Sequence, residues 1–308
     1  MRTVRKIAIV VFATLVILCI GIVGIILVPT PYKNSTYGMY ARQNSYLKNA
    51  KSPKMIYVSG SSGRFGIDAN YIEKKTGKTF VNLGNYAGYE NDFVLNTAMA
   101  NANKGDIILL AYENVRWTTE PDNGDAFAQL ASIDVEPKMI RYLSFKDAIN
   151  ILRILPTALA KKMDFVMGFS VMEDCSDSFD EHGNYIGRIE ECTIAEDNKV
   201  RDMISISKLN SNNMKYMEKI AKKARKKGVK ILLVSPPTLK EASVEPETID
   251  KAYQYIAERV GVEYISKANN HLFSRKYMAD SIWHCNRYGR EINTENLIIE
   301  LKQAKQID

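Results

Sequence analysis

The sequence predicts an α/β fold, a three-layer α/β/α sandwich with a parallel sheet, preceded by one transmembrane helix. Three observations lead to this fold class. The 308 residues are 46% hydrophobic and 25% charged, which is typical of a globular protein with a sizeable core. Short apolar segments alternate with helix-forming segments along most of the chain. Near the N-terminus, residues 7–28 form one apolar run of 22 residues.

The apolar run at residues 7–28 contains no charged residue and no proline. It is long enough to cross a hydrocarbon layer of ~30 Å as a helix and exceeds the ~7–15 apolar residues of a signal peptide. Arg2, Arg5 and Lys6 precede it, so the positive-inside rule places the N-terminus in the cytoplasm. We expect residues 1–30 to be a cytoplasmic tail and signal anchor, with the rest of the chain outside the cell. A buried core helix is the alternative.

The remainder of the chain divides into two parts. Residues 31–53 are polar and show no clear period, which predicts a short stalk that packs onto the domain. Residues 54–308 form the domain, with an insertion or cap at about 116–205 where the alternation of strands and helices breaks.

The expected strands are apolar on both faces, as in a parallel sheet whose two faces are covered. They are residues 55–58, 80–84, 106–112, 229–235 and 262–266. The expected helices are residues 67–75, 92–102, 145–163, 210–227, 247–260 and 287–304.

The net charge argues against a nucleic-acid partner. The chain carries 42 basic and 35 acidic residues, a formal charge of +7, and without Arg2, Arg5 and Lys6 the remainder carries +4. A charge this diluted suits a surface near anionic lipid or an anionic wall polymer better than nucleic acid.

The cysteines and histidines give no sign of a metal site. No cysteine pair has Cys-x-x-Cys spacing, and His182, His271 and His284 do not fall at ligand spacings, so we expect no metal and no cofactor. His182 and His271 are expected to be surface polar residues. Cys175 and Cys192 stand 17 positions apart in a polar stretch, which predicts a disulfide in an oxidising compartment, with two free thiols as the alternative.

A glycine- and serine-rich turn, residues 60–63, follows the first expected strand. Parallel sheets place their sites beyond the carboxyl ends of the strands, and a following helix offers N-terminal amides to a developing negative charge. The turn fits either a nucleophilic serine or a phosphate-holding glycine loop. Neither a Gly-x-Gly-x-x-Gly fingerprint nor a Walker lysine follows, which weakens the second interpretation.

A second segment with possible chemistry precedes the last expected helix and contains Asp280 and His284. Serine is a poor nucleophile until an imidazole takes its proton, and that imidazole needs an acceptor on its other nitrogen. Each segment alone is a weak signal, but together they supply the three side chains of a serine-dependent acyl-transfer site.

The paired segments resemble the SGNH (GDSL-like) hydrolase superfamily. Gly60, Ser61 and Ser62 match its Gly-Asp-Ser block with Ser in place of Asp, so the resemblance implies Ser62 as the nucleophile and His284 and Asp280 as its partners. The resemblance covers residues 54–115 and 208–303. Further matching positions are Gly66, Ile67, Asp68, Asn286, Gly289 and Thr294.

The most similar branch is membrane-anchored. It includes the protein that completes D-alanylation of teichoic acids and the partners of membrane-bound O-acyltransferases (MBOAT) in exopolysaccharide acetylation.

The oxyanion donors match less well. Residues 81–88 resemble the block that donates a glycine amide, with Gly84 and Gly88 both eligible. The Gly-x-Asn-Asp block is replaced by residues 111–114, where Asn114 is the candidate side-chain donor, displaced by one position. Each lost donor typically costs ~10²–10³ in rate, so this departure leaves room for a non-catalytic relative.

The resemblance implies a single-pass membrane protein with an extracellular, serine-dependent acyltransferase domain. It would O-acylate a cell-surface or secreted polysaccharide or wall polymer with an acetyl or D-alanyl group, supplied by an MBOAT partner. The same triad with water as acceptor would make a carbohydrate O-acyl esterase. A non-catalytic scaffold or glycan-binding protein is the third possibility.

Overall fold

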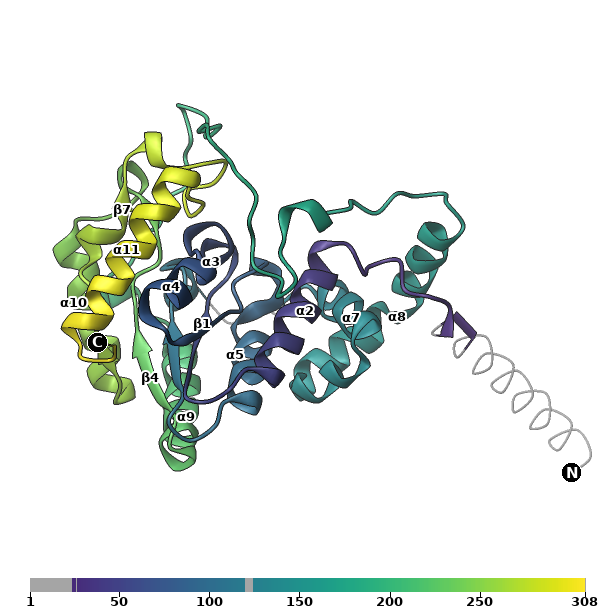
Figure 1. Ribbon diagram of the computed structural model, residues 1–308, viewed down its shortest axis with the longest axis horizontal. Coiled ribbons are helices and arrows are strands. Elements are labelled where there is room, and N and C mark those ends of the chain that lie inside the picture. Colours follow the sequence, from purple (N-terminus) through teal and green to yellow (C-terminus); the bar gives the residue numbers. More distant parts are fainter. Residues whose placement is uncertain (1–23, 26, 120–123, 308) are drawn as a thin grey trace, which may run out of the picture.

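The computed structural model describes residues 24–25, 27–119 and 124–307 of the chain (Figure 1). The expected membrane anchor at residues 7–28 lies almost entirely outside these residues. Within the described ranges, none of the helices combines the length and the hydrophobicity that crossing a membrane requires.

The domain is built on a five-stranded sheet in the order β2-β1-β3-β4-β6, and every strand pair in it is parallel. This confirms the α/β class and the parallel sheet. Each strand lies within one of the ranges expected from the sequence or exceeds it by one residue. The strands are β1 (Lys54–Val58), β2 (Thr79–Asn82), β3 (Ile107–Leu110), β4 (Lys230–Leu233) and β6 (Glu263–Tyr264).

Helices cover both faces of the sheet, as an α/β sandwich requires. Successive side chains of a strand point to opposite faces, so Ile56 and Val58 of β1 enter one core cluster, whereas Met55 and Tyr57 enter another. The first cluster includes side chains of α5 (Glu90–Asn101), α9 (Ser211–Lys227) and α10 (Pro246–Val260). The second includes side chains of α4 (Ala69–Thr76) and α11 (Arg287–Gln303), which lie side by side in Figure 1.

The segment expected to be a stalk contains a helix, α2 (Thr36–Asn49), which packs against α5 and α7 (Ala126–Val135). Ser35 caps this helix, and Met39, Tyr40 and Leu47 are buried. Residues 31–53 therefore pack onto the domain as expected, but they do so as a helix that contributes side chains to its core.

The insertion at about 116–205 also contributes to the core. It holds α7, a 3-10 helix (Pro137–Tyr142) and the long α8 (Phe145–Val166); α6 (Val115–Thr118) begins one residue before it. Trp117, Met139 and Tyr142 are buried in the cluster that contains Ile56. The insertion is therefore more than a cover over the edge of the sheet.

A second, two-stranded sheet pairs β5 (Thr238–Leu239) with β7 (Leu272–Phe273), and nothing in the sequence pattern indicated it. Leu239 and Phe273 pack with Ile282 and Cys285 in a small cluster. This sheet thus supports the segment that carries Asp280 and His284.

The expected disulfide between Cys175 and Cys192 is wrong, because both thiols are free. Cys175 packs with Met39 and Phe179, whereas Cys192 packs against the cluster of Phe273. The two cysteines thus belong to separate parts of the structure.

The expectation that His271 is a surface residue is also wrong. His271 is buried, and its ring nitrogens lie 2.7 Å from Asn293 Oδ1 and 2.9 Å from Glu300 Oε2. Glu300 also accepts a hydrogen bond from Ser266. This buried network fixes the loop before β7 to α11.

A buried ion pair joins the start of β1 to the turn before β3. Lys54 Nζ lies 3.0 Å from Asp106 Oδ2, and the two side chains are 1% and 0% exposed. Asp106 also accepts hydrogen bonds from the backbone amides of Lys54 and Asn103. Burial alone would raise the pKa of Asp106, but these hydrogen bonds outweigh it and hold the pKa below its ordinary value.

We predict that Asp106→Ala lowers the free energy of unfolding by about 3–5 kcal/mol, because it leaves the Lys54 ammonium buried without an anionic partner. Urea unfolding at neutral pH measures the change. Glu263→Ala, which removes the exposed partner of Lys230, is the control and should cost no more than about 1 kcal/mol. Since the pKa of Asp106 is lowered in the folded state, its stabilisation is present above the unfolded carboxyl pKa and is lost as the pH falls through the folded one. Equal losses in the two variants would contradict the prediction.

Candidate active site

The turn after β1 presents two serines at the start of a short helix, α3 (Ser61–Gly66). Gly60 precedes the helix, and a Cβ atom at this position would lie 2.6 Å from Glu113 Oε1. A Cβ atom on Gly63 would lie 2.0 Å from Ser59 Oγ. A side chain at either position would therefore displace Glu113 or Ser59, so both glycines allow the serine turn to pack closely against its neighbours.

Asp280 and His284 lie on a tight turn just before α11. The amide of Ala279 donates to the carbonyl of His284 and the amide of His284 donates to the carbonyl of Ser281, with bridge pairing between Met278 and Cys285 at the base. The Phe65 ring lies 4.3 Å from the His284 ring, centroid to centroid, and packs against it from α3. The turn thus holds the imidazole directly above the beginning of α3.

The structure joins His284 to Ser61 and not to Ser62. His284 Nε2 lies 2.8 Å from Ser61 Oγ, and His284 Nδ1 lies 2.8 Å from Asp280 Oδ1. These three side chains have the hydrogen-bond order of a serine, histidine and aspartate triad. The hydrogen bond to His284 lowers the pKa of Asp280, which keeps its carboxylate ionised at neutral pH.

The expectation that Ser62 faces His284 is therefore wrong. Ser62 is fully buried, and its Oγ has no hydrogen-bond partner among the described residues. Helix α3 begins at Ser61, so the side chains of these neighbouring serines point about 100° apart around the helix axis. Only the first of them can reach the imidazole.

Within the described structure, none of the three candidate oxyanion donors forms a hydrogen bond with Ser61; each has other neighbours. The Gly84 amide donates to Asn82 Oδ1 over 2.8 Å. Gly88 lies in a 3-10 helix (Ala87–Tyr89), and a Cβ atom there would meet the Tyr86 ring and Asp125. Asn114 Nδ2 donates to Asp202 Oδ2 over 3.1 Å. In this structure Gly84 and Asn114 brace the scaffold of the site instead.

Glu113 places a buried carboxylate beneath the serine turn. Its Oε1 accepts a hydrogen bond from the Ser62 amide over 3.2 Å, and its Oε2 is buried without a recorded partner. The Ser62 amide is therefore occupied and is not free to donate to an oxyanion. Among the residues that the structure describes, no acceptor is recorded for the Ser61 amide, which leaves it available as a donor beside Ser61 Oγ.

A second buried carboxylate, Asp202, lies behind the histidine turn. Its Oδ2 accepts hydrogen bonds from Trp283 Nε1 at 2.9 Å and from Asn114 Nδ2, while its Oδ1 has no recorded partner. Burial raises the pKa of Asp202 to about 6, and the negative charge of Glu113 adds to the effect. Trp283 directly precedes His284, so Asp202 is a positioning residue for the histidine turn.

Sequence reasoning missed Ser61, Glu113 and Asp202 as site residues. Ser61 was present in the motif but was assigned to the position of the superfamily's Asp. Glu113 follows the third strand, where parallel sheets gather functional groups, and this placement could have singled it out. Asp202 lies in a turn-rich stretch with no motif around it, so its position depends on the tertiary structure. In the described ranges, no group of three or more His, Cys, Asp or Glu side chains is arranged to hold a metal ion.

We predict that Trp283 fluorescence changes with a midpoint near pH 6, because its indole donates to the carboxyl group of Asp202. Asp202→Asn should abolish this transition. Trp283→Phe, which leaves Trp117 as the sole tryptophan, is the control for assignment and should also show none. Because folding raises the pKa of Asp202, its ionisation should lower stability as the pH rises from the ordinary carboxyl range to about 6. An unchanged midpoint in Asp202→Asn would assign the transition to another group.

Comparison with known proteins adds no relative from which a role could be transferred: neither a protein-family model nor a curated protein matches the chain.

Proposed function

We propose that this protein is an extracytoplasmic, serine-dependent acyltransferase with an SGNH-like domain, and that Ser61 is its nucleophile. The observation that carries the proposal is the continuous contact from Ser61 Oγ through His284 to Asp280, with 2.8 Å at each step. The substrate would be a polysaccharide or wall polymer that receives an acetyl or D-alanyl group. An MBOAT-type membrane protein would supply the acyl group.

In the first half of the reaction, Ser61 Oγ attacks the acyl carbonyl while His284 Nε2 takes the hydroxyl proton. Asp280 accepts the hydrogen bond from Nδ1–H and stabilises the imidazolium that forms. The tetrahedral intermediate collapses when the bond to the acyl carrier breaks, and His284 returns the proton to that leaving group. The product is an acyl ester on Ser61.

In the second half, an acceptor hydroxyl replaces the departed carrier beside His284. The imidazole takes its proton, the acceptor oxygen attacks the acyl-serine, and Ser61 leaves with the proton from His284. The acyl group ends as an ester on the polymer. The Ser61 amide supplies a donor to the oxyanion in both halves.

The solvent exposure of the triad also supports an esterase as a second candidate. The Asp280 side chain is 59% exposed and that of His284 is 15% exposed, so the triad lies near bulk water. Water could then replace the polymer hydroxyl in the second half-reaction. Transfer requires that a bound acceptor exclude water from this position, and pocket shape decides between the two outcomes.

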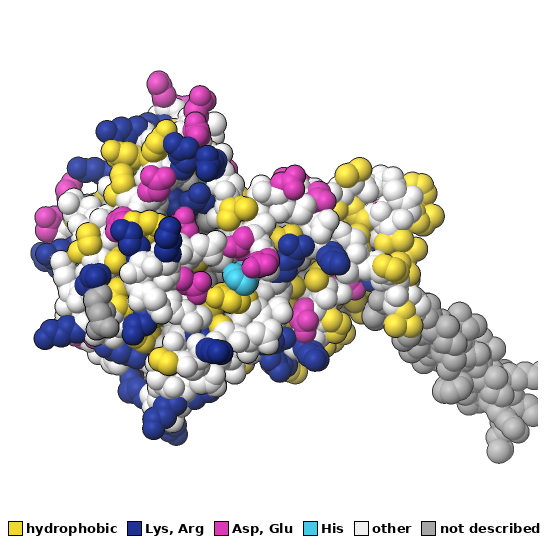
Figure 2. All heavy atoms as spheres, in the orientation of Figure 1, with side chains coloured by type: hydrophobic (Ala, Val, Ile, Leu, Met, Phe, Trp, Pro, Cys, Tyr) yellow, Lys and Arg dark blue, Asp and Glu magenta, His cyan; other side chains and the backbone are white. Residues whose placement is uncertain are grey.

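An apolar patch next to the start of the described chain supports a position at the membrane. It consists of exposed side chains at the end of α8 and in the segment after it: Val166, Met167, Phe169 and Val171. Phe169 is 73% exposed and Val171 is 92% exposed. Figure 2 shows hydrophobic side chains gathered at the end of the molecule where the described chain begins.

A lipid bilayer is the occupant that best fits this apolar patch. The Tyr32 ring contacts Phe165 of α8 at a centroid distance of 6.0 Å, so the chain enters the domain beside the patch. The apolar run of residues 7–28 ends only four positions before Tyr32. An anchor in the membrane would therefore bring the patch to the bilayer surface.

We predict that Ser61→Ala abolishes acyl transfer, with a loss of roughly 10⁴-fold or more, because the nucleophile is removed. Ser62→Ala is the matched control and should retain activity, since Ser62 Oγ makes no recorded hydrogen bond. Reaction of the purified protein with a fluorophosphonate, followed by peptide mass spectrometry, should place the label on Ser61. Labelling of Ser62, or an inactive Ser62→Ala with an active Ser61→Ala, would refute the assignment of the nucleophile.

The sign of the cellular phenotype separates the candidate functions. Ser61→Ala should lower polymer acylation if the protein is a transferase and raise it if the protein is an esterase. The measurement is the ester content of the surface polymer in strains that express wild type, Ser61→Ala or no protein. Wild-type acylation in the Ser61→Ala strain, together with a loss on deletion, would instead indicate a non-catalytic scaffold.

We predict that a reporter fused after Asp308 is active outside the cytoplasm and that the mature protein retains its N-terminus. The reason is the length of the apolar run and the basic residues before it. Proteolysis of intact cells, followed by immunoblotting of the C-terminal domain, tests the orientation. Protection of the domain would contradict it, whereas a released form beginning near Pro29 would contradict only the anchor.

A further inference from the structure

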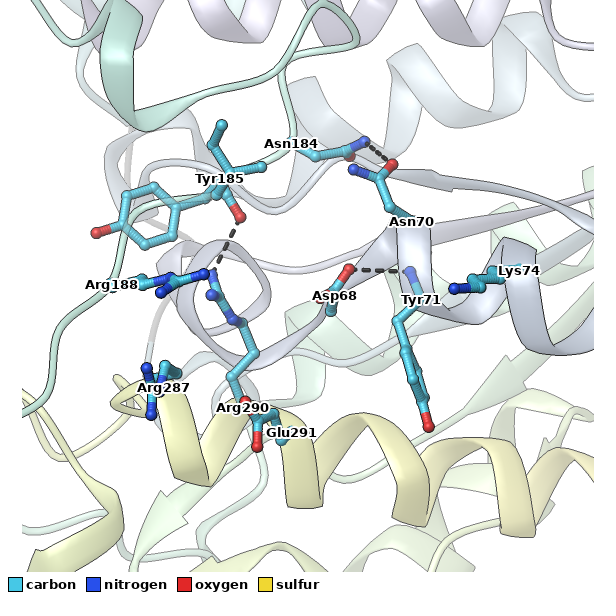
Figure 3. A pocket seen from close by; sticks show the side chains of 11 residues that line it. Asp68, Asn70, Tyr71, Lys74, Asn184, Tyr185, Arg188, Arg287, Arg290 and Glu291 are labelled. Atoms are coloured by element: carbon cyan, nitrogen blue, oxygen red, sulfur yellow. Dashed lines mark hydrogen bonds between the residues drawn. The ribbon is translucent and has the colours of Figure 1, made fainter.

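A cavity of about 400 Å³ lies between α4, the segment at residues 184–188 and the start of α11 (Figure 3). More basic than acidic side chains line it. The proposed acyl-transfer steps do not use this cavity. Four basic side chains and two acidic ones contribute to it. They are Lys74, Arg188, Arg287 and Arg290, with Asp68 and Glu291.

The clearest sign of a ligand site in this cavity is the guanidinium of Arg290. It is only 8% exposed, yet among the described residues no carboxylate lies within ion-pair distance of its guanidinium. Its one recorded side-chain hydrogen bond goes from Nη1 to the carbonyl of Tyr185, over 3.1 Å. A buried cation without an anionic partner is costly, and a guanidinium offers five donors in a planar fork. The cavity therefore holds a charge that a bound anion would neutralise.

The neighbouring charges balance one another in number, since three cations (Lys74, Arg188 and Arg287) stand against three carboxylates (Asp68, Glu190 and Glu291), so the charge of Arg290 remains in excess. Arg287 contacts Glu190 at 3.2 Å, but its Nε is buried without a recorded partner. Arg188 and Lys74 are exposed on the rim of the cavity. The carboxylate of Asp68 already accepts the Tyr71 amide at the start of α4, so it is engaged in capping that helix.

The cavity is connected to the triad through two aromatic rings. The Arg290 guanidinium lies 5.6 Å from the centroid of the Tyr185 ring. That ring packs against Phe65 at 4.9 Å, and Phe65 packs against His284 at 4.3 Å. An extended molecule that fills the cavity could therefore pass over Tyr185 and present its next unit to Ser61.

We propose that this cavity binds an oxyanion carried by the acceptor polymer, a phosphate ester or the carboxylate of a sugar acid, with Arg290 as its central ligand. The proposal rests on the proposed acyl-transfer function and names the class of acceptor. The planar guanidinium groups of Arg290 and Arg287 match either oxyanion through paired hydrogen bonds. A cavity of this size can hold one sugar or polyol unit with its charged group.

The test measures binding by the full-length protein in detergent micelles, with Ser61→Ala in every sample so that no turnover occurs. The probes are glycerol 3-phosphate for the phosphate ester, glucuronate for the carboxylate and galactose as the neutral control. Calorimetry should detect at least one of the two anions and should not detect galactose. Binding of glycerol 3-phosphate alone or glucuronate alone identifies the source of the oxyanion, and either result supports the proposal.

Arg290→Gln should weaken binding of the preferred anion roughly ten- to hundredfold, because it removes charged hydrogen bonds from a buried site. Arg188→Gln, on the exposed rim, should weaken binding of the same anion severalfold. Because Arg188 is exposed, this variant keeps the folded core, and it tests the site even if Arg290→Gln does not fold. Arg259→Gln on α10 is the matched control and should leave affinity unchanged, since Arg259 pairs with Glu218 on the exposed surface.

Two results would overturn the proposal: no measurable binding of either anion, or affinities that neither Arg290→Gln nor Arg188→Gln changes. Both are distinct from failure of the proposed function, which appears as unlabelled Ser61 in the fluorophosphonate reaction.

Discussion

The contact between Ser61 and His284 depends on the docking of α11 against the connection between α3 and α4. Asn293 Nδ2 donates to the carbonyl of Gly66 over 2.8 Å, and the amide of Asp68 donates to Thr294 Oγ1 over 3.0 Å. Asn293 and Thr294 are fully buried, so these hydrogen bonds fix the two segments without competition from water. A displacement of about 1 Å between reacting groups can cost ~10² in rate. This interface therefore affects the rate by holding Ser61 and His284 in place, although Asn293 and Thr294 are not part of the triad.

The parts of the structure that could be predicted from the sequence are those with a local pattern of residues. Strands β1, β3 and β4 of the main sheet were predictable because they are mostly apolar on both faces, and the helix at residues 287–304 was predictable from its composition. Asp280 and His284 were predictable as a pair because they precede that helix. The choice between Ser61 and Ser62 was not, since it depends on the residue at which α3 begins, and a shift of one residue turns the side chain by about 100°.

The other errors share one cause, which is that composition does not reveal tertiary partners. The stretch at residues 31–53 looked like a polar stalk because α2 buries polar side chains, such as Gln43, whose Nε2 donates to the Gly84 carbonyl. His271 looked like a surface residue because its partner Glu300 lies 29 positions away. Cysteine spacing suggested a disulfide, but each thiol is covered by a different set of apolar neighbours.

The charges around the triad are segregated, and this segregation has a chemical consequence. Glu113 and Asp202 are buried on the side of the sheet, where negative charge favours an imidazolium at His284 and disfavours an oxyanion. Two cations gather instead around Tyr185: the Arg64 guanidinium lies 4.6 Å from the Phe179 ring centroid and 5.1 Å from that of Tyr185, and the Arg290 guanidinium also contacts the Tyr185 ring. Negative charge that develops on the substrate is therefore best accommodated on the side of the cations. An acceptor that is itself anionic would approach from that side, and its own charge would be neutralised before its hydroxyl reached Ser61.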